Sequence, residues 1–91
     1  MNYLKLYKEM IANNAFDDLD NIMLIEKSIK SKDYEMAYFI SRAIYARAKH
    51  EKTKIKLSLS LINNGLENIV PFKYLKIIEQ NPYLIIEQEY K

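Results

Sequence analysis

Apolar residues recur every three or four positions along most of this chain, which is the spacing of helices that bury one face. The first such segment covers about residues 3–13, with Asn2 as a candidate N-cap and Asn13 and Asn14 at its end. The pattern predicts an amphipathic helix. Its apolar stripe consists of Tyr3, Leu4, Tyr7, Met10 and Ile11.

The second segment, FDDLDNIMLIEKSIK at residues 16–30, begins with acidic residues that suit a helix N-terminus. Asp17 or Asp18 is the candidate N-cap, and Asp20 lies in the first turn. The pattern is imperfect because Glu26 falls within the apolar arc. The predicted buried side consists of Leu19, Ile22, Met23, Ile25 and Ile29.

The third segment, YEMAYFISRAIYARAKHEK at residues 34–52, has the most regular pattern. Ser31, Lys32 and Asp33 form a short break before it, so the second and third helices should make an αα-hairpin. Such a connection also suits a helix-turn-helix. The predicted buried face consists of Met36, Ala37, Phe39, Ile40, Ala43 and Ile44.

Residues 53–70 allow two interpretations. The letters IKLSLSLI alternate apolar and polar as a half-buried strand does, and Asn64-Gly65 could turn a hairpin into LENIV. The same letters fit a buried helix in which Ile55, Leu59, Ile62 and Leu66 align and Gly65 follows the last helical turn. We favour the helix because a lone hairpin would have no sheet to join.

Two proline-led segments close the chain. Pro71 and Pro82 are predicted to stand at helix starts, and Asn81 is a candidate cap. The whole chain has one Gly and two Pro in 91 residues, which leaves few of the tight turns that a sheet needs. The predicted fold is therefore all-α: a small single-domain bundle of about five short helices over residues 1–91, with a hairpin within 53–70 as the alternative.

Charge is unevenly distributed along the chain, whose net charge is +2. Residues 42–56 carry six basic residues and one acid, whereas residues 1–41 carry five basic and seven acidic residues. At 100° per residue, one stripe of residues 38–56 lies opposite the apolar face, and its members are Tyr38, Arg42, Tyr45, Lys49, Lys52 and Lys56. The stripe predicts either an ordinary solvated helix face or a surface for a partner, because Tyr and Arg dominate binding hot spots.

Arg47 departs from this pattern because it falls on the apolar side of the same helix, where an unpaired guanidinium would be costly. Either the helix extends beyond the core there, or Arg47 has a partner such as Glu51, four residues later. We favour a structural role and keep Arg47 among the candidate partner-binding residues.

The amino-acid composition limits which metal, phosphate-binding and catalytic sites this chain can form. With no Cys and one histidine, His50, the chain lacks the usual zinc ligands, and a single Gly excludes a glycine-rich phosphate loop. His50 forms no recognisable arrangement with Ser41, Ser58 or Glu51 for nucleophilic catalysis. We therefore expect no enzyme activity, cofactor or metal. No apolar run is long enough to span a membrane, and the expected location is the cytoplasm.

These observations favour a small macromolecule-binding protein, a protein-interaction inhibitor or adaptor. The frequent use of Lys, Ile, Asn and Tyr, whose codons are AT-rich, is compatible with a phage or mobile element. The alternative is a nonspecific nucleic-acid-binding protein that uses the basic helix 38–56. Sequence-specific groove binding is disfavoured because Asp33 and Glu35, not basic residues, occupy the first turns of the third helix. The sequence does not identify the partner or the oligomeric state.

Overall fold

The computed structural model describes residues 2–84. No strand occurs in these residues, so the predicted all-α class is confirmed and the hairpin alternative within 53–70 is wrong. The elements, in chain order, are α1 (Tyr3–Ala12), α2 (Asp20–Lys30), α3 (Tyr34–Arg47), α4 (Glu51–Asn63), the short 3₁₀ helix η1 (Glu67–Ile69) and α5 (Phe72–Gln80).

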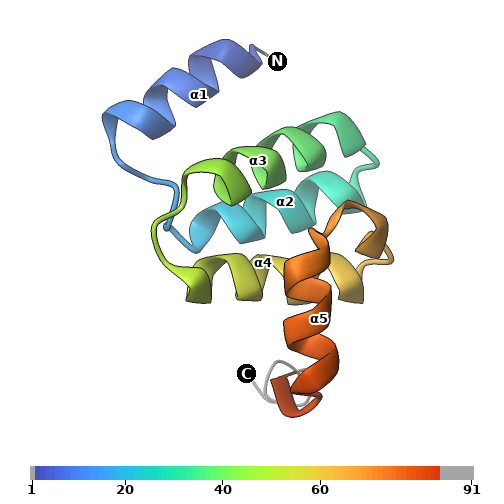
Figure 1. Ribbon diagram of the computed structural model, residues 1–91. Helices are drawn as coiled ribbons and strands as arrows, with labels where there is room; N and C mark the ends of the chain where they lie inside the picture. Colours follow the sequence, from blue (N-terminus) through green and yellow to red (C-terminus); the bar gives the residue numbers. More distant parts are fainter. Residues whose placement is uncertain (1, 85–91) are drawn as a thin grey trace.

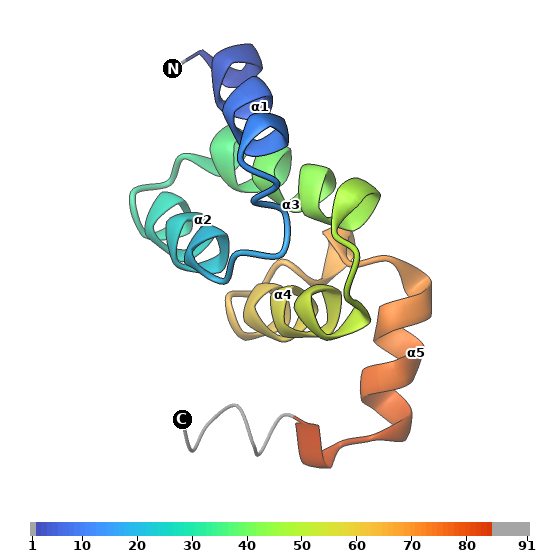
Figure 2. The ribbon, with the colours of Figure 1, turned by 90° about the vertical axis from the view of Figure 1, so that its left-hand side faces the viewer.

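The central part of the molecule consists of α2, α3 and α4, which run side by side in Figure 1 and are seen obliquely in Figure 2. The αα-hairpin predicted for the second and third helices is present, and α2 and α3 make the most extensive helix contact. α1 lies against α3, while η1 and α5 pack on α4. This arrangement leaves one side of α3 between α1 and η1.

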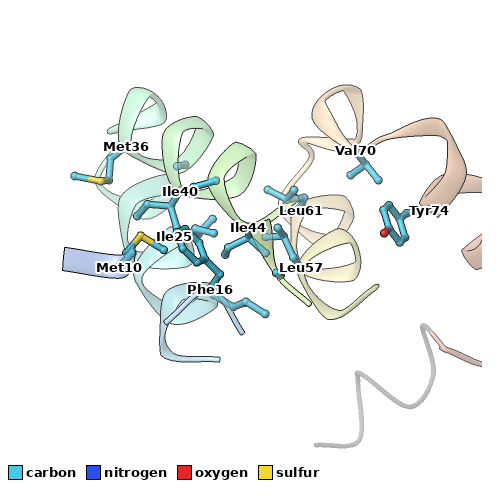
Figure 3. Packing of buried hydrophobic residues seen from close by; sticks show 14 residues of the cluster. Met10, Phe16, Ile25, Met36, Ile40, Ile44, Leu57, Leu61, Val70 and Tyr74 are labelled. Atoms are coloured by element: carbon cyan, nitrogen blue, oxygen red, sulfur yellow. The ribbon is translucent and has the colours of Figure 1, made fainter. Parts of the chain in front are cut away.

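The apolar core joins these three helices. Its largest fully buried apolar side chains come from α2, α3 and α4 and are Ile25, Met36, Ile40, Ile44, Leu57 and Leu61. Met10 and Phe16 extend the core toward α1, and Val70 and Tyr74 extend it toward α5 (Figure 3). Residues 57–61 are all buried, which is typical of a central helix surrounded by other elements. The strand-like alternation of Leu and Ser in α4 therefore reflects burial on all sides.

Local signals set some of the helix ends. The predicted N-cap of α2 at Asp17 or Asp18 is wrong, because Leu19 occupies that position without a side-chain cap. The Asn2 side chain accepts a hydrogen bond from the Lys5 amide at 3.0 Å, as predicted for an N-cap. After α4, the Leu66 amide donates to the Leu61 carbonyl at 2.8 Å and the Gly65 amide donates to the Ile62 carbonyl at 3.1 Å. Gly65 has φ = 77°, so the helix ends in a Schellman motif that requires the glycine predicted for this position.

The third helix is shorter than predicted. It ends at Arg47, and α4 begins at Glu51, so the prediction of one helix over residues 34–52 is wrong. Ala48 and His50 have extended backbones, with ψ of 139° and 126°. The carboxylate of Asp17 accepts hydrogen bonds from the amides of Lys49 at 2.8 Å and His50 at 3.0 Å, which satisfies donors that a continuous helix would have used.

Some residues of α1 and α2 that were predicted to be buried are exposed. Leu4 is 60% exposed and Met23 is 57% exposed, although both were expected to face the core. The helices pack on fewer neighbours than the pattern implies, because α1 packs mainly on α3. Glu26, the exception in the apolar arc of α2, faces α4 and accepts a hydrogen bond from the Ser60 hydroxyl at 2.9 Å. Of the second closing segment, residues 85–91 lie outside the described residues.

Candidate partner-binding surface

The predicted stripe of Tyr and basic residues does not form one continuous surface. Tyr38, Arg42 and Tyr45 belong to α3, whereas Lys52 and Lys56 belong to α4 beyond the break at residues 48–50. The two helices therefore carry separate halves of the stripe. The basic helix 38–56 of the nucleic-acid alternative is likewise divided.

Tyr38 and Arg42 form an exposed ridge along α3, which we call the α3 ridge. The Tyr38 ring lies 6.4 Å from that of Tyr34, one turn earlier, and both tyrosines are exposed large aromatic residues. Arg42 makes no ion pair or hydrogen bond with any other residue in the 2–84 range. The ridge thus presents an aromatic ring and an unneutralised cation to solvent.

An open groove of about 600 Å³ lies on one side of the α3 ridge, between α1 and α3. Aromatic rings from both helices contact each other there, since the Tyr3 and Phe39 ring centroids are 5.2 Å apart and those of Tyr7 and Phe39 are 6.1 Å apart. The residues that line this α1–α3 groove are Tyr3, Tyr7, Glu35, Tyr38, Phe39, Arg42, Ala43 and Ala46.

A smaller and more enclosed cavity of about 310 Å³ lies on the other side of the ridge, between α3 and η1. Tyr38, Ser41, Arg42 and Tyr45 line it from α3, at positions i, i+3, i+4 and i+7, and Ile69 lines it from η1. We call it the Ser41 cavity. Tyr38 and Arg42 therefore separate two concave regions.

Tyr45 was predicted to be exposed, but it is half-buried because its hydroxyl points toward α4. It lies 2.6 Å from the Ser58 hydroxyl and donates to it, because Ser58 donates its own proton to the Lys54 carbonyl. The Tyr45 ring stacks on Tyr74 of α5 with centroids 5.6 Å apart. Burial raises the pKa of Tyr45 to about 12. Tyr45 thus joins α3 to α4 and α5.

Arg47 is exposed at the end of α3 and has a structural partner. Its Nε donates a hydrogen bond to the Tyr7 hydroxyl, and its guanidinium lies 5.5 Å from the centre of the Tyr7 ring. The predicted pairing with Glu51 is wrong, because Glu51 instead accepts a hydrogen bond from Tyr74 and pairs with Lys54 and Lys73. Arg47 thereby attaches α1 to the end of α3.

The remaining basic residues gather at the start of α4. His50, Lys52 and Lys56 line a shallow pocket of about 260 Å³ that also contains Asp17 and Thr53. The Lys49 amide, which donates to Asp17, holds the pKa of that carboxyl below its ordinary value of 3.8. A carboxylate within the basic cluster reduces its attraction for an anion.

Sequence reasoning missed the two concave regions. It treated Ser41 only as a candidate nucleophile, although its i+3 spacing from Tyr38 places both residues on one helix face. Tyr3, Tyr7 and Phe39 were interpreted only as core residues. Within residues 2–84 no group of three or more His, Asp or Glu side chains is arranged to hold a metal ion. The arrangement around α3 is suited to binding.

Comparisons give no assignment for this chain: no protein-family model matches it, and no curated protein or solved structure shows significant similarity to it. None of the helices in the described range 2–84 is long and apolar enough to cross a membrane.

Proposed function

We propose that the protein is a small protein-binding factor, acting as an inhibitor or adaptor, that contacts its partner through the α3 ridge. The observation that carries this proposal is the exposure of Tyr38 and Arg42 between two concave regions of α3. Tyr and Arg are enriched among interface residues that dominate binding energy, and such residues pair with pockets on the partner. Frequent use of amino acids with AT-rich codons fits a factor of a phage or mobile element acting in the cytoplasm.

Affinity capture with the tagged chain tests this proposal. A partner identified by mass spectrometry should be retained by wild type and lost when Tyr38→Ala and Arg42→Ala are combined. The matched control combines Lys49→Ala with Lys52→Ala, which removes two exposed charges from the other basic region. Circular dichroism should show that both double variants remain folded. Equal retention of the partner by the α3-ridge variant and wild type would contradict the proposal.

Nonspecific nucleic-acid binding is the second candidate function, and the excess of basic residues in 42–56 supports it. The division of that stretch between two helices and the presence of Asp17 among the lysines weigh against it. Affinity for a mixed oligonucleotide pool, measured at several salt concentrations, separates the two functions. Tight binding that falls steeply with salt, and that is lost in the Lys49 and Lys52 double variant, would favour nucleic acid.

A further inference from the structure

The Ser41 cavity contains polar groups that the fold leaves without partners. Ser41 is 1% exposed, and its hydroxyl oxygen is the only buried side-chain nitrogen or oxygen without a hydrogen-bond partner among residues 2–84. Ser28 and Ser58, also buried in helices, donate to carbonyls four residues earlier, at 2.9 Å and 2.7 Å. Ser41 makes no equivalent bond. An unpaired buried hydroxyl lowers stability, and one that lines a cavity is available to hydrogen-bond a ligand.

Two further donors line the same cavity. The Arg42 guanidinium has no acidic partner in the described part of the chain, and the Tyr38 hydroxyl makes no hydrogen bond there. The Tyr45 hydroxyl already donates to Ser58, and Ile69 supplies an apolar wall. No acidic residue lines the cavity, because Glu35 belongs to the α1–α3 groove. The cavity therefore offers one positive charge and unpaired hydroxyls.

Charge balance indicates which anion fits. One guanidinium neutralises one carboxylate, and its planar donors match carboxylate geometry. A phosphate group carries up to two charges and recruits several cations or backbone amides, which this cavity does not provide. The volume of about 310 Å³ is at the lower end for small-molecule sites and can accommodate an amino-acid side chain.

We propose that the Ser41 cavity binds one carboxylate, supplied by an Asp or Glu side chain of the protein partner. This inference rests on the proposed function and specifies the chemistry of the partner. The carboxylate accepts hydrogen bonds from Arg42 and the Ser41 hydroxyl, and apolar neighbours in the partner contact Tyr38 and Ile69. Entry requires movement of Tyr38 and Arg42, which are exposed and change rotamer rapidly.

Small carboxylates test the site without knowledge of the partner. The full-length chain, labelled with ¹⁵N, is titrated with N-acetylglutamate methylamide and with the neutral N-acetylglutamine methylamide. We expect saturable amide shifts at Ser41, Arg42 and Ile69 with the glutamate compound alone. Equal shifts with the glutamine compound, tighter binding of inorganic phosphate, or no saturable shift would overturn the proposal.

A peptide distinguishes the source of the carboxylate. A short peptide with one Glu between apolar residues should bind more tightly than N-acetylglutamate methylamide, because it adds contacts with Tyr38 and Ile69. The same peptide with Gln in place of Glu should bind at least about tenfold more weakly, as expected for loss of a hydrogen-bonded charge. If the isolated glutamate derivative binds as tightly as the peptide, a protein source for the carboxylate is wrong.

Substitutions at Ser41 and Arg42 distinguish a role in binding the carboxylate from a purely structural role. Ser41→Ala should weaken binding of the glutamate compound several-fold while leaving the thermal midpoint unchanged or raising it, because it removes an unpaired buried hydroxyl. Arg42→Gln should weaken binding about tenfold or more, whereas Lys52→Gln, at the other basic region, should leave it unchanged. A lower midpoint for Ser41→Ala with unaltered binding would overturn the proposal.

These results separate failure of the site from failure of the proposed function. If affinity capture depends on Tyr38 and Arg42 but Ser41→Ala and the carboxylate titrations have no effect, the carboxylate site is wrong and the protein-binding function stands. If the carboxylate binds as expected but the α3-ridge variant still captures the partner, the function fails and the site remains.

Discussion

Helices α3 and α4 are both central to the fold, yet they differ in whether their buried hydroxyl groups have hydrogen-bond partners. On α4, the buried hydroxyls of Ser58 and Ser60 have partners in Lys54, Tyr45 and Glu26. On α3, the buried Ser41 has none within residues 2–84. The charges differ likewise, because Lys54 of α4 pairs with Glu51 at 3.7 Å, whereas Arg42 of α3 forms no ion pair in the described chain.

This difference teaches that basic character alone does not identify a binding surface. The start of α4 is the more lysine-rich of the two regions, but it also contains acidic groups, because Asp17 binds the Lys49 and His50 amides and Glu51 pairs with Lys54. The α3 face has fewer charges and unused hydrogen-bonding capacity. An unsatisfied buried polar group requires an explanation, and the proposed carboxylate site provides one.

The largest expected effect is the loss of stability on truncating a buried core residue of either α3 or α4. Ile40→Ala on α3 and Leu57→Ala on α4 should each lower the free energy of unfolding by roughly 2–5 kcal/mol, because both side chains are at most 1% exposed and truncation leaves a cavity. Denaturant unfolding measures this loss. Leu4→Ala, at a residue that is 60% exposed, is the matched control and should change stability by no more than about 0.5 kcal/mol. A small loss at either buried position would show that the helices do not share one core.

The next effect concerns the attachment of α4 to the rest of the fold. Asp17→Ala removes the acceptor for two backbone amides and should lower the thermal midpoint more than Asp18→Ala, whose carboxylate accepts only the local Asp20 amide at 2.9 Å. The pKa of Asp17 is lowered in the folded chain, so its contribution is present above its ordinary value of 3.8 and is lost as the pH falls through the folded pKa. Unfolding measured as a function of pH should show the two proteins converging in acid. Parallel curves throughout acid would contradict this role.

A smaller effect contrasts the buried serines directly. Ser58→Ala should destabilise the protein by about 1 kcal/mol, since the half-buried Tyr45 hydroxyl loses its acceptor. Ser41→Ala should cause no loss. Denaturant unfolding of both variants under the same conditions measures the difference, and equal losses would remove the distinction between α3 and α4.

The smallest effect concerns the exposed charges. Arg42→Ala and Lys49→Ala should each change stability by no more than about 0.5 kcal/mol, as exposed substitutions usually do. Thermal melts followed by far-ultraviolet circular dichroism provide the measurement. A protein that unfolds when both are replaced would show that these residues support the fold.

The sequence predicted the helices where local chemistry determines them. Asn2 and Gly65 were predicted to mark helix ends and do so in the structure, because each acts within three or four residues of itself. The end of α3 was missed because no Gly or Pro lies at residues 48–50. That break is accompanied by hydrogen bonds from Asp17, which is 32 residues before Lys49, and helical periodicity contains no information about such a contact.

The candidate site was predictable only in part for the same reason. Tyr38 and Arg42 are exposed, as the helical wheel predicted. Tyr45 was expected on the same exposed stripe, but η1 and α5 follow α4 in the chain and return to cover it with Tyr74. The cavity beside Ser41 needs Ile69, 28 residues later along the chain, and no spacing rule connects the two.

The bond from Asp17 to the start of α4 also has a consequence for hydrogen exchange. The amides of Lys49 and His50 belong to exposed residues in a connection between helices, where exchange with solvent is ordinarily fast. Because both amides donate to a carboxylate from another part of the chain, their exchange requires opening of a long-range contact. Their protection factors therefore report whether the segment between α1 and α2 is closed on α4, and they should fall together when that segment opens.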